Sequence, residues 1–264
     1  MGALQECTWE KVEKWCPETK SVIFSWGEST ITLEDLLIVG YSVLGSPVFC
    51  PVETDELNEL EEKLNQARSE LNKRTRIALA PTVLASIYKD LSSLKEKIVA
   101  LTKFDNWGDE DNELAVTVRS PFQLVQTWAW ERVLHLRPEL NLIKMGGRRF
   151  AWWHEQFIVV ENVRVIDSAK DDFDWRPYVK PVTNWNSPKF YREKEMLISV
   201  DPNLSEKLLS FAHCLRVSKL VGFECIEQYP LHRVAMQFGM DQDLPPCVAR
   251  INEIPSIAWN YYRC

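Results

Sequence analysis

The residues with the greatest chemical potential lie in one short stretch, KMGGRRFAWWH, at positions 144–154. A double glycine there precedes two arginines and three aromatic residues. Backbone freedom, guanidinium planes and aromatic faces together suit a nucleic-acid contact. The alternative is a turn that leads into a buried aromatic strand, with both arginines paired to acids on the surface. The candidate nucleic-acid contacts here are Lys144, Arg148 and Arg149, and the candidate partner contacts are Trp152 and Trp153.

Two other charged groups have the residue types of a binding site. Lys73, Arg74 and Arg76 form a basic turn that could contact phosphates. Three aspartates fall within residues 171–174, and clustered carboxylates can hold a divalent cation. No glycine or regular alternate spacing shapes a calcium loop there, however, and no second cluster completes a two-metal site. We therefore expect a solvated loop at the aspartates and no metal centre.

No residue pattern in the sequence indicates a catalytic site. The four histidines lie near no nucleophile motif, and each is expected to be a packed or surface residue. The seven cysteines form no CxxC pair, and their odd number favours reduced, mostly buried thiols. A pyridoxal enzyme needs a Schiff-base lysine, an acidic partner for the pyridine nitrogen and a phosphate cup, and none can be identified. We predict no catalytic residue and no cofactor.

The composition is that of a globular protein with one large core or two small ones. The 264 residues are 45% hydrophobic and 26% charged, and the net charge of −7 argues against a surface that coats nucleic acid indiscriminately. A local basic patch remains compatible with that charge. Eleven tryptophans suggest a large core with anchors left over for a partner. The sequence shows no bilayer-length apolar run and no secretion signal, so we expect an intracellular protein.

The clearest of the elements that must position these residues is a helix over residues 120–138, SPFQLVQTWAWERVLHLRP. Ser120 can cap its N-terminus, Pro121 suits its first position, and Gln123 can close a capping box. Apolar residues recur at three- and four-residue steps, and Leu124 and Trp128 widen that stripe. This pattern predicts a helix that is largely surrounded by protein.

The N-terminal half of the chain predicts a short helix ended by Pro17, a strand hairpin over residues 22–32, and a helix capped by Thr32 and stopped by Gly40. Residues 54–102 carry two apolar ladders on helical spacing, separated by Pro81. We interpret them as an inserted antiparallel helical hairpin, which either projects from the main domain or packs as ordinary core helices.

The C-terminal half predicts a second strand hairpin over residues 156–167, a helix over residues 203–214, a strand over residues 221–229, and a helix that begins at Pro230 and is closed by Gly239. Together the elements indicate a helix-rich α+β fold, in which short antiparallel strands lie beside a compact helical core. We expect one domain over residues 1–264, with the helical hairpin inserted at about 54–102.

Four ordered segments resemble the plant mobile domain, a family also labelled "aminotransferase-like" and found in retrotransposons and in free-standing plant proteins. The first is EKWCPETKSVIFSWGESTITLEDLLIVGYSVLGSPVF. The others are PTVLASIYKDLSSLKEKIV, PFQLVQTWAWERVLHLRP and LHRVAMQFGMDQDLPPCV. The resemblance covers nearly the whole chain. It implies a nuclear protein that takes part in transcriptional regulation and transposable-element silencing, with partners that include a phosphatase-like protein and other plant mobile domain proteins.

Three functional hypotheses follow from these observations. The first is a non-catalytic interaction module that acts through protein partners. The second is a sequence-specific DNA-binding domain that uses the local basic and aromatic residues, and the third is an enzyme in keeping with the family label. Since no catalytic constellation supports the third hypothesis, we expect the chain not to be an enzyme.

Overall fold

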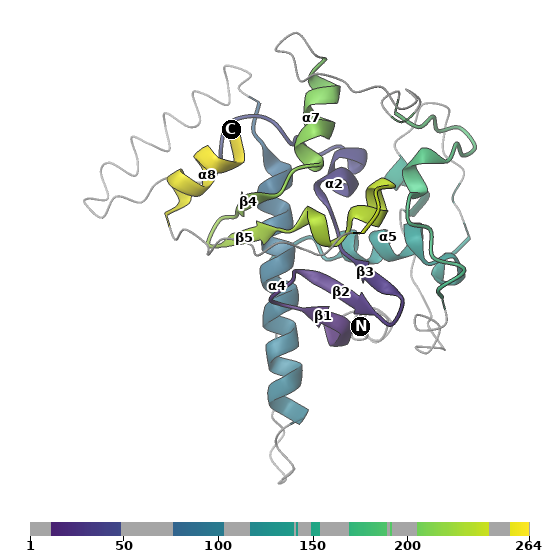
Figure 1. Cartoon of the computed structure of the whole chain (residues 1–264), viewed down its shortest axis with the longest axis horizontal. Helices are drawn as coiled ribbons and strands as arrows, with labels where there is room; N and C mark the ends of the chain where they lie inside the picture. Colours follow the sequence, from purple (N-terminus) through teal and green to yellow (C-terminus); the bar gives the residue numbers. More distant parts are fainter. Residues whose placement is uncertain are drawn as a thin grey trace.

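The computed structural model shows a mixed fold of helices and two small antiparallel sheets, which confirms the predicted helix-rich α+β class (Figure 1). No helix within the described part of the chain has the length and apolar character needed to span a membrane. The structure describes residues 12–48, 76–102, 117–139, 141, 149–153, 169–188, 191, 205–242 and 254–263. The predicted hairpin at 156–167 and the first predicted helix of the 54–102 insertion lie outside these ranges.

The first sheet contains β1 (Trp15–Cys16), β2 (Ser21–Phe24) and β3 (Gly27–Ser29) in that order. The β2–β3 hairpin is confirmed, although its turn lies at residues 25–26 because Phe24 pairs with Gly27. The predicted N-terminal helix is wrong beyond residue 14, since Trp15 and Cys16 pair with β2 instead of continuing the helix. Pairing with β2 therefore determines the structure of Trp15 and Cys16, although their apolar spacing also fits a helix.

Helix α2 (Leu33–Val39) has the predicted caps at both ends. The Thr32 side chain accepts a hydrogen bond from the Asp35 backbone N–H, and the Asp35 carboxylate accepts one from the Thr32 N–H at 2.7 Å. Gly40 ends the helix with a φ of 112°, in the left-handed region that glycine adopts without strain. This capping box places Glu34 and Asp35 in the interior of the protein, where both are buried.

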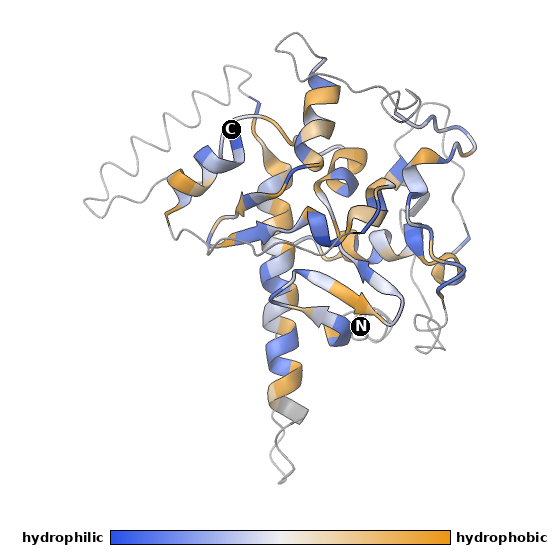
Figure 2. Ribbon diagram, in the orientation of Figure 1, coloured by the Kyte–Doolittle hydropathy of each residue, from blue (hydrophilic) through white to orange (hydrophobic). Residues whose placement is uncertain are grey.

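Helix α4 (Leu79–Thr102) is the long axis around which the other elements pack. Its predicted apolar ladder is confirmed over Leu84, Ile87, Leu91 and Leu94, which are all buried. Pro81 lies in the first turn, where its missing N–H costs no helical hydrogen bond. The C-terminal turns of α4 extend past the other labelled elements (Figure 1). Apolar residues are concentrated where α2 and the N-terminal half of α4 lie (Figure 2).

Helix α5 (Gln123–Arg132) is the predicted interior helix, but it is shorter than expected. Ser120 does not cap it; the Asp90 carboxylate on α4 instead accepts hydrogen bonds from the Arg119 and Ser120 backbone N–H groups, at 3.0 and 2.8 Å. The α-helix ends at Val133, which has an extended backbone and forms a β-bridge with Phe173. A 3-10 turn (Leu134–Leu136) follows it. The predicted burial of the helix is confirmed from Leu124 to Arg132, apart from Gln126.

The second sheet corrects the predicted single strand over residues 221–229. It is a hairpin of β4 (Ser218–Val221) and β5 (Ile226–Tyr229), and residues 222–225 form the turn. The preceding helix α7 (Glu206–Cys214) is confirmed. The helix predicted after Pro230 is a pair of 3-10 turns (Leu231–Arg233 and Ala235–Phe238), closed as expected by Gly239 with a φ of 74°.

A C-terminal helix, α8 (Pro255–Arg263), packs against β4 and was not predicted from the sequence. It buries Ala258, Trp259 and Tyr262, and the Tyr262 hydroxyl donates to the Val43 carbonyl oxygen at 2.8 Å. This bond connects the C-terminal helix to the segment that follows α2.

Candidate functional site

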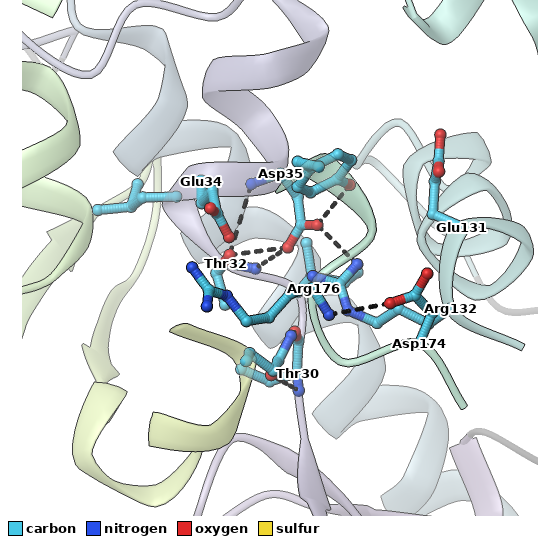
Figure 3. Close-up of polar contacts among 12 residues, drawn as sticks. Thr30, Thr32, Glu34, Asp35, Glu131, Arg132, Asp174 and Arg176 are labelled. Atoms are coloured by element: carbon cyan, nitrogen blue, oxygen red, sulfur yellow. Dashed lines mark hydrogen bonds and ion pairs between the residues drawn. The ribbon is translucent and has the colours of Figure 1, made fainter. Parts of the chain in front are cut away.

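Five charged residues and one tyrosine from several segments lie in the interior and form what we call the buried ionic cluster: Glu34, Asp35, Glu131, Arg132, Arg149 and Tyr178. Figure 3 shows Glu34, Asp35, Glu131 and Arg132 of this cluster. Helix α2 supplies two of them at its N-terminus, and α5 supplies two at its C-terminus. The others come from the 3-10 turns Arg149–Trp153 and Pro177–Val179. Residues up to 144 positions apart in the sequence, from 34 to 178, thus share one site.

The Arg132 guanidinium forms the first ion pair of the cluster with Asp35. Its Nη1 lies 2.8 Å from the Asp35 Oδ1, and the two side chains are 0% and 6% exposed. The Tyr178 hydroxyl donates to the same carboxylate oxygen at 2.6 Å. Burial alone would lower the pKa of Arg132, but the neighbouring Asp35 more than offsets this and raises it. Arg132 is therefore a permanently charged side chain that depends on one buried carboxylate.

The second ion pair joins Arg149 to Glu131. The Arg149 Nε donates to the Glu131 Oε1 at 2.9 Å, and its Nη2 donates to Oε2 at 2.7 Å. The Trp153 indole N–H donates to the same carboxylate at 2.9 Å. The guanidinium also lies over the rings of Trp152 and Trp185, at 5.2 and 4.7 Å from their centroids. The ion pair is therefore bidentate, and cation–π contacts with the two tryptophan rings add to it.

These contacts correct part of the sequence interpretation. Arg149 is 3% exposed, so it cannot reach a phosphate on the surface, and Trp152 and Trp153 are 5% and 4% exposed, so neither is a surface anchor. The alternative of a buried aromatic segment describes them better, although the acid that pairs with Arg149 is in the core. Arg76 is exposed, donates to the Ser42 hydroxyl at 3.0 Å and forms an ion pair with Glu206. The remaining candidates, Lys73, Arg74, Lys144 and Arg148, lie outside the described residues.

The aspartates within residues 171–174 do not converge on a common point. Asp174 is buried and pairs with Lys180 at 2.7 Å, whereas Asp172 pairs with His135 at 2.7 Å on the surface. Among the described residues, no three His, Cys, Asp or Glu side chains are grouped as a metal ion would require. Asp174 is therefore engaged in an ion pair and Asp172 in a hydrogen bond to His135, and the expected solvated loop is wrong at the buried Asp174.

Glu34 differs from the other acids of the cluster because no cation of the described residues forms an ion pair with it. Burial, together with the neighbouring Asp35, raises the pKa of Glu34 from 4.5 to about 7. The Tyr191 hydroxyl donates to its Oε1. Below pH 7 the folded protein thus holds a neutral carboxylic acid beside an ionised cluster.

Replacing Glu34 with glutamine is expected to remove a pH dependence of folding stability. The folded pKa of about 7 lies above the unfolded value of 4.5, so Glu34 favours folding fully below pH 4.5 and loses that contribution as the pH rises to 7. Above pH 7, Glu34→Gln should raise the free energy of unfolding by about 3 kcal/mol, because a neutral amide replaces a buried anion. Urea denaturation at several pH values measures this.

Glu28→Gln is the matched control for Glu34→Gln. Burial alone would raise the pKa of Glu28, but hydrogen bonds from Arg233 and Ser21 outweigh burial and lower it. Neutralising Glu28 should therefore destabilise the protein at neutral pH, in the opposite direction. A Glu34→Gln protein with the same stability as the parent above pH 7 would show that Glu34 is not a buried, neutral acid.

The surface offers a different kind of site, which we call the α4 groove. It has a volume of about 760 Å³ and lies between α4, residues 117–121 and the β4–β5 turn. Val83, Pro121 and Cys225 contribute apolar wall, and Lys89, Lys97 and Arg119 contribute positive charge. Burial, with Glu227 nearby, raises the pKa of the Cys225 thiol to about 11, so this wall is neutral. Neither the groove nor Phe223 beside it was singled out by the sequence interpretation.

A family model for the plant mobile domain matches residues 5–75 and 67–263 of the chain. The match includes all four segments that carry the resemblance noted in the sequence. No curated protein matched the chain, and neither did any solved structure.

Proposed function

Because this chain belongs to the plant mobile domain family, we propose that it is a non-catalytic nuclear interaction module that acts through protein partners in transcriptional regulation and transposable-element silencing. The partners proposed are a phosphatase-like protein and other plant mobile domain proteins. One observation carries the proposal: the Glu131–Arg149 and Asp35–Arg132 ion pairs are buried in the core, so these four charged side chains cannot contact a substrate or a partner. Recognition is then left to surfaces such as the α4 groove.

A sequence-specific DNA-binding domain is the alternative. Burial of Arg149 removes one of the cations assigned to it, while Arg76 stays exposed beside Glu206. The alternative depends on the remaining candidates, Lys73, Arg74, Arg76, Lys144 and Arg148, within a chain of net charge −7. An enzyme in keeping with the aminotransferase-like label has less support still. None of the described lysines is buried as a Schiff-base lysine is.

Affinity capture from plant nuclear extract tests the proposal. The full chain is immobilised, and the extract is divided between nuclease-treated and untreated samples. We expect the chain to retain a phosphatase-like protein equally in both samples, because the contact is between proteins. Retention that disappears after nuclease treatment would favour the DNA-binding alternative. Capture of neither a phosphatase-like protein nor another plant mobile domain protein would refute the interaction module in the form proposed.

A further inference from the structure

Exposed apolar side chains are concentrated on one side of helix α8. Ile254, directly before the helix, and Ile257 and Tyr261 within it are 53%, 46% and 56% exposed. They follow one another at steps of three and four residues, so they form one stripe along the helix. The residues by which α8 packs against the protein lie outside this stripe. Helix α8 therefore presents a second apolar side that the described residues do not cover.

The apolar surface continues onto the segment that leads into β4. Leu215 and Val217 are each 37% exposed. Side chains alternate between the two faces of a strand, so Val217 points to the same side as Lys219. The Lys219 ammonium lies 5.7 Å from the centroid of the Tyr261 ring, and α8 packs along β4 (Figure 1). This side of β4 thus adjoins the stripe.

We call this surface the α8 face: Leu215, Val217, Ile254, Ile257 and Tyr261. Eleven large apolar side chains are exposed among the described residues, and five of them belong to this face. Single exposed apolar residues are common on protein surfaces, whereas a contiguous group marks an interaction site. Within the described part of the chain, the α8 face is therefore the apolar surface best suited to contact a partner.

Two arginines beside the α8 face have no acid to neutralise them among the described residues. The Arg216 Nη2 donates to the Tyr261 carbonyl oxygen at 3.4 Å, which is a neutral acceptor. Arg263 lies exposed in the last turn of α8. Residues 214–221 and 254–263 contain no Asp or Glu. The C-terminus of a helix carries about half a negative charge, which is less than the two positive charges of these arginines.

The effect of Arg216 on its neighbours agrees with an unpaired charge. Burial, together with Arg216, lowers the pKa of His213, and no acid of the described residues acts in the opposite direction. Burial raises the pKa of Tyr262, and Arg216 opposes this rise. Positive charge thus prevails around the α8 face, although the whole chain has 38 acidic and 31 basic residues.

We propose that the α8 face binds an acidic amphipathic segment of a protein partner. The apolar side chains of that segment pack on Val217, Ile257 and Tyr261, and its carboxylates pair with Arg216 and Arg263. This inference rests on the proposed function, because it states the chemistry of the protein partner that such a module recognises.

Two other occupants fit the α8 face less well. A nucleic acid requires a row of cations along its phosphates, and the four aliphatic side chains of the face offer it no ring on which a base can stack. A second copy of this chain, bound through the same face, would bring Arg216 and Arg263 of both copies together, and like charges across an interface oppose binding.

Selection of a random peptide library on the intact chain tests this inference. We expect the retained peptides to carry apolar residues at steps of three and four, flanked by aspartates or glutamates. The most enriched peptide is then synthesised twice, once as selected and once with every acid replaced by its amide. The amide peptide should bind at least about tenfold more weakly, and this difference should shrink at high salt.

Variants of the chain locate the binding site. Ile257→Ala should weaken binding of the selected peptide about tenfold, as for an apolar anchor, and Arg216→Gln should weaken it about fivefold. Alanine is favourable in a helix, and a glutamine at 216 can still donate to the Tyr261 carbonyl oxygen, so the fold should tolerate both changes. Unchanged urea denaturation of each variant checks this.

Two matched variants control for surface changes elsewhere. Ile23→Ala removes an isoleucine of similar exposure on β2, and Lys170→Gln removes an exposed cation outside the α8 face. Both should bind the selected peptide as the parent does. Peptides without acids, or binding that Ile257→Ala and Arg216→Gln leave unchanged, would overturn the inference. So would binding of a single-stranded oligonucleotide, or a concentration-dependent dimer, that these two variants abolish while acidic peptides fail to bind.

The nuclear capture experiment separates failure of this inference from failure of the proposed function. If Ile257→Ala still retains the phosphatase-like protein and the library yields no acidic consensus, the role of the α8 face is refuted and the interaction module stands. If the parent chain retains no such partner but binds acidic peptides through the α8 face, the proposed partner is refuted and the α8 face stands.

Discussion

Replacing Glu131 with glutamine is expected to lower the free energy of unfolding by about 3 to 5 kcal/mol, because it leaves the Arg149 guanidinium buried without its counter-charge. Arg149 and Glu131 are 3% and 2% exposed, so water cannot replace the lost carboxylate. The amide also presents one acceptor oxygen in place of two, and the bidentate geometry is lost. Urea denaturation followed by tryptophan fluorescence measures the change.

Two further variants make the Glu131 prediction specific. Asp172→Asn breaks the exposed contact with His135 and should cost less than about 1 kcal/mol. The double variant Glu131→Gln with Arg149→Met should recover part of the loss, because the unpaired charge is gone. A Glu131→Gln protein that unfolds at the same urea concentration as the parent would contradict the burial of this pair.

Asp35→Asn is the second change with a large expected effect, again about 3 to 5 kcal/mol. It removes the charge that neutralises Arg132, whose side chain is 0% exposed. It also weakens the hydrogen bonds that the carboxylate accepts from Thr32 and Tyr178. The loss should appear as a lower midpoint in thermal and urea unfolding.

Thr32→Ala separates capping from charge in the Asp35 prediction. It deletes the hydroxyl that caps α2 but leaves the ion pair with Arg132 intact, so we expect a loss of about 1 kcal/mol. Equal losses in Asp35→Asn and Thr32→Ala would mean that Asp35 acts only as a helix cap. A double variant with Arg132→Met that regains stability over Asp35→Asn would support the ion pair.

The parts of the fold that could be predicted from sequence are those specified by neighbouring residues. Thr32, Asp35 and Gly40 define α2 because a capping box and a left-handed glycine act within one or two turns. Helix α4 could likewise be predicted from the three- and four-residue spacing of its own apolar residues. The turn at residues 222–225 was missed because an alternating apolar pattern fits one strand or two, although Gly222 was a signal for a break.

The buried ionic cluster could not be predicted, because it depends on contacts between distant segments. The sequence placed Arg149 on a surface, and only the packing of α5 against the turn at 149–153 shows that Glu131 neutralises it. One local signal was available: Glu131 and Arg132 end a helix that the sequence predicts to be surrounded by protein. Charged residues inside a predicted interior helix indicate partners elsewhere in the core, but the spacing does not identify those partners.

The central claim is that the chain recognises protein partners at its surface. Its buried charged residues, such as Glu131 and Arg149, pair with one another in the core and take no part in recognition. Capture from nuclear extract with and without nuclease tests it most directly. The account predicts that the immobilised chain retains a phosphatase-like protein in equal amount under both conditions. Retention that requires intact DNA, and that falls steeply as salt is raised, would contradict the account and identify a DNA-binding domain.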